Sequence, residues 1–174
     1  MNFIRPNLAV CGFHHIRRQE HFQQYGFHAQ LQCAEPFDPW LAECLEVKAL
    51  PFYDAAPIPS GIFSQAQAWL ARHWDQDNRI LISCAGGASR SVTMAIALLS
   101  LKAGVTFLSA TAEVIEKIPD TYPHPLVLLS ASCLCGEPLT LADLRHVYAS
   151  VQEQPPYPWS EELLKQAVKQ LCVE

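Results

Sequence analysis

Residues 79–103 read RILISCAGGASRSVTMAIALLSLKA, a short apolar run, a loop with two glycines and a long apolar run. Its first five residues, Arg79–Ser83, form a short apolar run between turn-forming residues, which is typical of a buried strand. Residues Ser91–Ala103 are almost wholly apolar and end before Gly104, which predicts a helix buried on most sides. The loop between strand and helix therefore lies where α/β sheets bind their ligands.

Strands and helices alternate early in the chain, and helices alone follow. Besides Arg79–Ser83, the patterns predict strands at Leu8–Gly12, His28–Cys33 and Glu46–Phe52. The other predicted helices are Arg17–Tyr25, a turn at Leu41–Leu45, Gly61–Asp75, Thr106–Lys117, Leu126–Leu134, a helix from Thr140 to about Gln152, and Glu161–Leu171. This order favours an α/β fold with a central, mainly parallel sheet flanked by helices and an all-helical C-terminal part.

The length and the composition suit one domain. A chain of 174 residues, half of them apolar, can bury one core comfortably but not two. We therefore predict a single domain over residues 1–174, with residues 137–174 as a helical C-terminal extension. Thr140 and Ser160 are the expected caps of its helices, joined by an exposed linker at Glu153–Pro158.

Charge and hydropathy exclude several classes of partner. A formal net charge of −5 argues against a broad basic surface, so we expect neither nucleic acid nor a membrane as a partner. Residues Met1–Arg18 contain only a short apolar run, unlike a secretory signal, and no stretch approaches the roughly 20 apolar residues that cross a bilayer. A soluble, cytoplasmic protein is expected, and its oligomeric state stays open.

Seven cysteines, an odd number without a framework pattern, argue against disulfides. Cys133 and Cys135 are separated by one residue, no second pair follows, and the histidines show no ligand spacing, so no metal is expected. Four further cysteines lie in apolar segments and are expected to serve packing: Cys11, Cys33, Cys44 and Cys172. Cys84 lies in the loop between strand and helix, so packing is not its expected role.

The loop SCAGGASRS, residues 83–91, has the features of an anion site. Gly86 and Gly87 permit backbone conformations closed to other residues, so successive N–H groups can turn inward around an oxyanion. The start of the following helix adds its positive dipole end, and Arg90 offers a planar fork for two oxygens. We predict a phosphate site formed by Ala85, Gly86, Gly87, Ala88, Ser89 and Arg90.

Cys84 lies at the base of this predicted ring, in a positive field that favours the nucleophilic thiolate. Ser91 follows Arg90, and its hydroxyl has two candidate roles. It can donate a hydrogen bond to the cysteine sulfur and help a thiolate leave, or it can cap the helix. The sequence leaves both roles open.

From Leu8 to Gly136 the sequence resembles the cysteine-dependent protein tyrosine phosphatase superfamily, especially its dual-specificity branch and small bacterial phosphatase-like proteins. The family pattern is a cysteine, five residues, an arginine and then serine or threonine, matched here by Cys84, Arg90 and Ser91. Asp54, at the end of a predicted strand and thirty residues before Cys84, matches the place of the family's general acid. In the turn TYPHP, which matches the pocket edge, His124 is the residue expected near substrate.

The resemblance implies a protein phosphatase acting on phosphotyrosine, phosphoserine or phosphothreonine, or a hydrolase of another small phosphomonoester, without a cofactor. In that mechanism Cys84 attacks phosphorus and Arg90 stabilises the transition state. Asp54 protonates the leaving oxygen and then acts as the base for water. Three alternative acids lie at expected helix ends or far from the loop: Asp38, Asp75 and Asp77.

One residue departs from the family pattern. The position before the nucleophile, usually histidine, holds Ser83, which is smaller and cannot carry a charge. This difference motivates a second interpretation, a phosphatase-like module that binds phosphorylated ligands with weak or no turnover. A sulfurtransferase, which also presents a reactive cysteine in an oxyanion-binding loop, is a third, although Ser91 and Asp54 fit a phosphatase better.

Overall fold

The computed structural model describes residues 1–16, 23–37, 39–150 and 160–171. Within these residues the apolar runs form a five-stranded sheet with the order β1-β2-β5-β3-β4. Strand β1 (Asn2–Arg5) pairs antiparallel with β2 at one edge. The remaining strands run parallel: β2 (Leu8–Gly12), β5 (Ile80–Cys84), β3 (Ala29–Gln32) and β4 (Glu46–Ala49). The predicted α/β fold with a mainly parallel sheet is confirmed.

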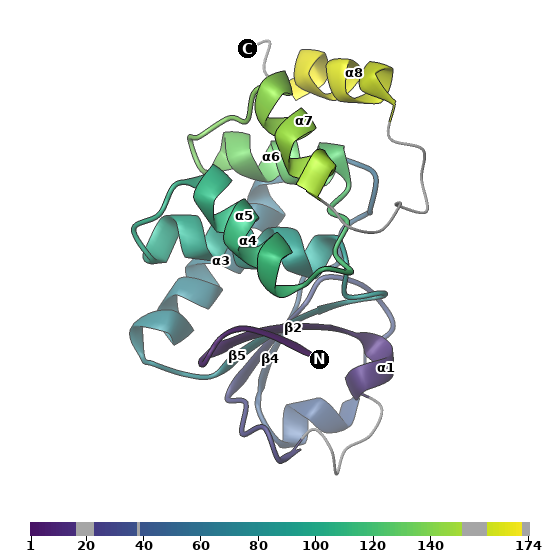
Figure 1. Cartoon of the computed structure of the whole chain (residues 1–174). Helices are drawn as coiled ribbons and strands as arrows, with labels where there is room; N and C mark the ends of the chain where they lie inside the picture. Colours follow the sequence, from purple (N-terminus) through teal and green to yellow (C-terminus); the bar gives the residue numbers. More distant parts are fainter. Residues whose placement is uncertain (17–22, 38, 151–159, 172–174) are drawn as a thin grey trace.

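Most helices lie on one side of the sheet (Figure 1). There α4 (Arg90–Lys102) contacts β5 and β2 and is surrounded by α3 (Ser60–Asp75), α5 (Phe107–Lys117) and α6 (Pro125–Leu134). Farther from the sheet, α7 (Leu141–Ser150) packs on α5, and α8 (Glu161–Leu171) packs on α6. The short helix α1 (Phe13–Ile16) and the 3-10 helix η1 (Pro39–Glu43) lie away from α4, beyond the sheet.

One strand is not expected from the sequence, and another ends earlier than expected. Strand β1 has four residues, too few to carry a periodic pattern, and sequence analysis misses it. The strand expected at Glu46–Phe52 ends at Ala49 instead. Pro51 follows shortly after and has no N–H to donate to a neighbouring strand.

Some predicted segments fall largely outside the described residues. These are the helix at Arg17–Tyr25, the end of the helix expected to reach Gln152, and the linker Glu153–Pro158. The two expected caps can be judged: the Asp143 N–H donates to Thr140 Oγ1 at 3.2 Å, and the Leu163 N–H donates to Ser160 Oγ at 3.1 Å. Both caps are therefore confirmed.

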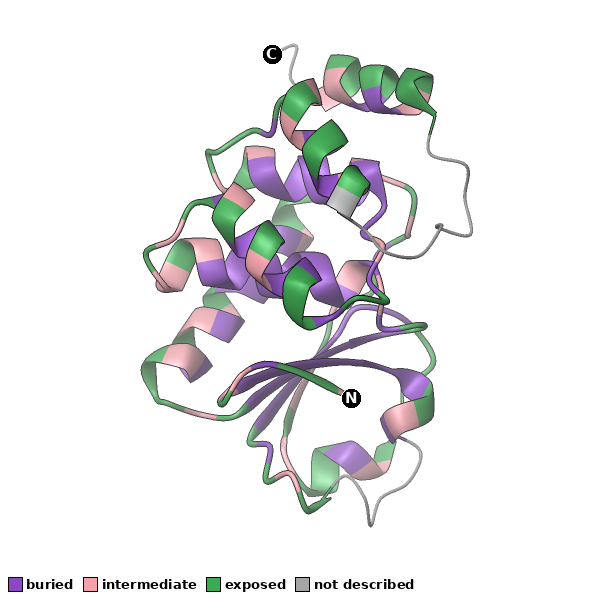
Figure 2. Ribbon diagram, viewed as in Figure 1, coloured by how far each residue is buried: buried purple, intermediate pink, exposed green. Residues whose placement is uncertain are grey.

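The core lies between the sheet and the inner helices, as Figure 2 shows by the concentration of buried residues there. Every residue of β2, β3 and β5 is buried. In α4 the nine consecutive residues from Ser91 to Leu99 are buried, which confirms a helix that is enclosed on most sides. Within the described parts of the chain, no helix combines the length and the apolar character that a membrane span requires.

Candidate active site

The candidate site lies at the carboxyl end of β5, where Cys84 is the last strand residue. Residues 85–89 form a loop, and α4 begins directly after it. Cys84 pairs with Gly12 at the end of β2, and the Cys33 N–H donates to the Ser83 carbonyl at 2.8 Å just beyond β3. The ends of three parallel strands thus meet at the loop, the usual place for ligands in such sheets.

The sulfur of Cys84 is hydrogen-bonded from two sides. The side chain is 2% exposed. The Gly87 N–H donates to Sγ at 3.3 Å, and Ser91 Oγ lies 3.2 Å from the same atom. Because α4 begins at Arg90, the cap position belongs to Ser89, and Ser91 lies inside the first turn. Of the two candidate contacts of Ser91, the structure contains the one to sulfur.

The two loop glycines differ in conformation. Gly87 has a φ of 80°, in the left-handed region, and a Cβ placed there would lie 2.6 Å from the carbonyl carbon of Cys11. The φ of Gly86 lies outside that region, and a Cβ placed there would meet nothing within 4 Å. Of the two glycines that permit conformations closed to other residues, Gly87 uses the left-handed one and Gly86 does not. Gly87 alone of the two requires glycine.

Hydrogen bonds on the outside of the loop fix the direction of its peptide groups. The Ala85 carbonyl accepts from the Phe13 N–H at 3.2 Å, and the Ala88 carbonyl accepts from the Tyr122 N–H at 2.9 Å. In a trans peptide the N–H points opposite to the carbonyl. The N–H groups of Gly86 and Ser89 belong to these peptide units, so they point away from the outer partners, as an oxyanion-binding loop requires.

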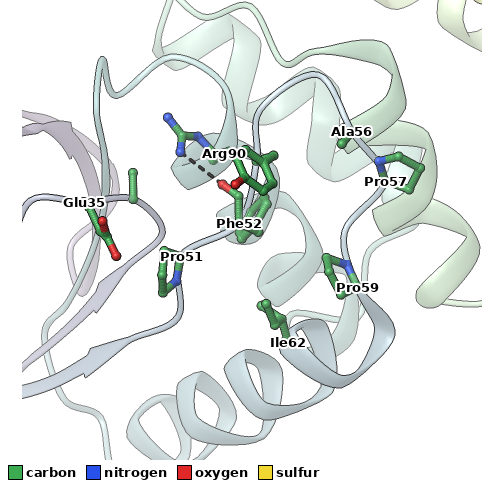
Figure 3. Close-up of a pocket in the computed structure, with 10 residues that line it drawn as sticks. Glu35, Pro51, Phe52, Ala56, Pro57, Pro59, Ile62 and Arg90 are labelled. Carbon is green, nitrogen blue, oxygen red and sulfur yellow. Dashed lines mark hydrogen bonds between the residues drawn. The ribbon is translucent and has the colours of Figure 1, made fainter.

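Arg90 connects the loop to two other strand ends. Its Nη1 donates to the carbonyl of Phe52 at 3.1 Å, drawn as the dashed line in Figure 3, and to the carbonyl of Cys33 at 3.4 Å. Its Nε is buried and makes no hydrogen bond within the described residues. The guanidinium is therefore anchored through Nη1, while Nε faces the carboxylate of Asp54 at ion-pair distance, 3.6 Å from Oδ2.

Asp54 lies beside the loop, as the sequence predicts. Its Oδ1 accepts from Ser89 Oγ at 2.7 Å, and its Oδ2 lies 3.6 Å from Arg90 Nε. Of the alternative acids, Asp75 forms an ion pair with Lys102, and Asp77 lies in the turn after α3 with a φ of 55°. The position of Asp38 lies outside the described residues.

The turn at residues 121–125 forms one wall of the site. Besides the Tyr122 N–H, Thr121 Oγ1 donates to the Ala88 carbonyl at 3.2 Å, and the His124 N–H donates to Ser89 Oγ at 3.0 Å. His124 is buried, and desolvation lowers the pKa of its imidazole, an effect that the nearby Asp54 carboxylate opposes. Contact between His124 and a substrate stays a prediction.

A cavity of about 430 Å³ adjoins Arg90 on the side of the Phe52 carbonyl (Figure 3). Its walls are mainly apolar, and Glu35 and Arg90 are the charged residues among those that line it. The full lining is Ala34, Glu35, Pro51, Phe52, Tyr53, Ala56, Pro57, Pro59, Ile62 and Arg90. Tyr53 and Ala56, on either side of Asp54 in the chain, line this cavity, so its apolar surface lies beside the guanidinium of Arg90.

The sequence alone matches no known family model and no curated protein. The three-dimensional structure does match solved structures. Tk-PTP in its active form superposes with a TM-score of 0.65 at 22% identity, covering 78% of this chain and 93% of that chain. DUSP15 gives 0.66 at 16% identity, covering 98% and 96% of the two chains. The human tyrosine phosphatase-like serine/threonine/tyrosine-interacting protein gives 0.64 at 16%, covering 86% and 97%.

This chain has the cysteine-dependent tyrosine and dual-specificity phosphatase fold. Within this phosphatase fold, the sequence finds Cys84, Arg90, Ser91 and Asp54, and the structure brings all four together. The hydroxyl of Ser89 is missed, because sequence analysis assigns this residue a backbone contact alone.

The neighbours of Cys84 within the phosphatase fold cannot be seen in the sequence. The register of β3 and β5 places Cys33 beside it, and burial raises the pKa of the Cys33 thiol well above its ordinary value. By contrast, Cys133 donates to the Leu171 carbonyl, 3.8 Å away in α8. Among the described residues, no group of three or more His, Cys, Asp and Glu comes together as a metal site.

Proposed function

We propose that this protein hydrolyses phosphomonoesters through a covalent intermediate on Cys84. The observation that carries the proposal is the setting of Cys84 Sγ, with the Gly87 N–H at 3.3 Å and Ser91 Oγ at 3.2 Å beside the start of α4. Hydrogen-bond donors and a helix N-terminus both stabilise a thiolate relative to a thiol. A cysteine that serves packing alone needs neither.

In the first step the Cys84 thiolate attacks phosphorus, and the bond between phosphorus and the ester oxygen breaks. Asp54, in its acid form, gives its proton to that departing oxygen, so the product leaves as a neutral alcohol or phenol. The inward N–H groups and Arg90 stabilise the charge on the equatorial oxygens of the transition state. The products are the free alcohol and a phosphorylated cysteine.

In the second step a water molecule releases the phosphate. The Asp54 carboxylate accepts a proton from this water as it attacks phosphorus, and the phosphorus–sulfur bond breaks. The sulfur leaves as a thiolate, which the Ser91 hydroxyl stabilises by donating a hydrogen bond. Cys84 and Asp54 return to their starting protonation states, and inorganic phosphate is the product.

The proposed substrates are proteins phosphorylated on tyrosine, with phosphoserine and phosphothreonine as the alternative sites. Ala85 and Gly86 are exposed, so the mouth of the loop is open to a phosphate on a large molecule. The apolar cavity beside Arg90 supplies a surface that suits an uncharged side chain rather than a second phosphate. Comparing phosphotyrosyl, phosphoseryl and phosphothreonyl peptides as substrates separates these classes.

The first test is hydrolysis of para-nitrophenyl phosphate under reducing conditions. The rate is measured from about pH 5 to pH 8, because acid–base catalysis makes the rate depend on pH. Cys84→Ser and Arg90→Ala are expected to abolish turnover, and Asp54→Ala to lower it by about 10²-fold. Cys44, for which the sequence wrongly predicts a packing role, is exposed and lies outside the site, so Cys44→Ser is the matched control and keeps the parental rate. Mass spectrometry of the acid-quenched parent is expected to detect phosphate on Cys84.

A second candidate is a binding module for phosphorylated partners. It is favoured by Ser83, which is fully buried and accepts a hydrogen bond from Gln30 Nε2 at 2.9 Å in place of the family's histidine. It also fits the similarity to the tyrosine phosphatase-like interacting protein. A parent without turnover that binds a phosphotyrosyl peptide, with binding lost in Arg90→Ala, would favour this candidate over the enzyme.

A further inference from the structure

The hydroxyl of Ser89 connects three parts of the site. Ser89 is 9% exposed. Its Oγ accepts from the His124 N–H at 3.0 Å and lies 2.7 Å from Asp54 Oδ1. A backbone N–H can donate but not accept, so the hydroxyl proton is left for the carboxylate. Ser89 therefore donates to Asp54 while the 121–125 turn holds its oxygen in place.

The two oxygens of Asp54 have different surroundings. Oδ1 lies near two donors, the Ser89 hydroxyl at 2.7 Å and the Ala55 N–H at 3.3 Å. Oδ2 lies 3.6 Å from Arg90 Nε, on the side of the group that would hold phosphate. An oxygen that accepts hydrogen bonds is a poor place for a proton. Oδ2 has only the ion pair with Arg90, whose charge a bound phosphate would offset, so with substrate in place the proton of the acid form is directed to Oδ2.

We infer that Ser89 is a positioning residue for the general acid: its side chain orients Asp54 so that Oδ2 carries the proton toward the ester oxygen. This inference rests on the proposed hydrolysis. It adds to the backbone contact that the sequence predicts for Ser89, because the phosphate loop would also set the geometry of its own acid. Asp54 is 34% exposed, so few other contacts restrict its side chain.

A structural role for Ser89 would have a different signature. Removing a contact that merely stabilises the loop slows all substrates alike. Removing a contact that orients the acid slows the esters whose leaving group needs a proton and spares those whose leaving group departs as a stable anion. The dependence of the rate on the leaving group therefore separates the two roles.

The experiment measures kcat/KM of the parent, Ser89→Ala and Ser89→Thr with phenyl phosphate, a poor leaving group, and 2,4-dinitrophenyl phosphate, a good one. For Ser89→Ala we expect a loss of about 10- to 100-fold with phenyl phosphate and less than about 3-fold with the dinitrophenyl ester. Ser89→Thr keeps the hydroxyl and is expected to recover most of the rate.

Thr121→Val is the matched control. Thr121 donates to the Ala88 carbonyl of the same loop and has no hydrogen bond to Asp54. It is expected to change both rates by the same factor. A second measurement compares Ser89→Ala in the Asp54→Ala background, where the inference expects no further selective loss because the acid is absent.

Equal losses for both esters in Ser89→Ala, or the same selective loss in Thr121→Val, would overturn the inference and leave the proposed function standing. A selective loss from Ser89→Ala that persists without Asp54 would overturn it as well. A parent that hydrolyses neither ester would instead overturn the proposed function and the inference together.

Discussion

Gly87 packs its backbone directly against Gly12. A Cβ on Gly87 would overlap the Gly12 nitrogen and the end of β2, and a Cβ on Gly12 would lie 2.7 Å from the Gly86 carbonyl oxygen. This mutual contact holds the loop down on the neighbouring strand. It also places the Gly87 N–H at 3.3 Å from the sulfur of Cys84.

Gly87→Ala is expected to destabilise the protein by at least about 3 kcal/mol, because a positive φ and a backbone clash act together. Gly86→Ala is the matched control, with open space and an ordinary φ, and should change stability by less than about 1 kcal/mol. Urea unfolding followed by circular dichroism measures both. Equal effects of the two substitutions would refute the close packing of Gly87 on β2.

Ser91→Ala is expected to slow hydrolysis of the phosphorylated Cys84 intermediate. The variant loses the hydroxyl 3.2 Å from Cys84 Sγ, so the leaving thiolate is less stabilised, and steady-state kcat should fall by about 10²-fold. The first turnover should stay fast, which gives a burst of released alcohol in stopped-flow measurements.

The matched control for Ser91 is Thr93→Val in the same helix. Thr93 is buried, and its Oγ1 has no hydrogen-bond partner within the described residues, so this substitution should not change kcat. If Ser91→Ala slowed the first turnover as much as the later ones, the proposed role of Ser91 in breakdown of the intermediate would be refuted.

His124 is expected to make stability depend on pH. Its Nδ1 accepts from the Leu126 N–H at 3.3 Å at the start of α6, and desolvation lowers the imidazole pKa from its ordinary 6.5. The unfolded chain therefore binds this proton more tightly than the folded protein does. The resulting contribution to stability is present above about pH 6.5 and decreases as the pH falls toward the folded pKa.

His124→Asn keeps an oxygen acceptor for the helix cap and removes the titrating ring. Its free energy of unfolding should decline less than that of the parent between about pH 7 and pH 5, as measured by urea unfolding. His14→Asn, at an exposed position, controls for the loss of an imidazole. If the free energy of unfolding fell equally with pH in the parent and in His124→Asn, the proposed effect of His124 on stability would be refuted.

Ser83→Ala is expected to lower the free energy of unfolding by about 1–3 kcal/mol, since the buried Gln30 Nε2 loses its acceptor. Ser64→Ala, on the exposed face of α3, should stay within about 0.5 kcal/mol of the parent. Ser83→His places a ring at a site with no exposure and should also destabilise, by about 1–3 kcal/mol. A Ser83→His variant as stable as the parent would mean that the position can take the family's histidine.

Much of this site follows from local sequence. The apolar strand before Cys84, the glycines after it and the apolar helix from Ser91 form one continuous segment, so their order fixes a strand, loop and helix without distant contacts. Asp54 is thirty residues away and is found through the spacing of the family pattern. Short or edge elements such as β1 carry too little pattern and depend on the neighbouring strand for their hydrogen bonds.

The α/β class, the candidate anion loop and the candidate nucleophile follow from the sequence because they depend on residue type and local order, whereas the candidate acid Asp54 follows from the spacing of the family pattern. That Gly87 rather than Gly86 has a left-handed conformation depends on the tertiary contact with the backbone at the end of β2. The tertiary structure also decided that the Ser89 hydroxyl meets Asp54 and that Cys33 lies beside Cys84. Such contacts join segments far apart in the chain, and packing and strand register set them rather than local propensity.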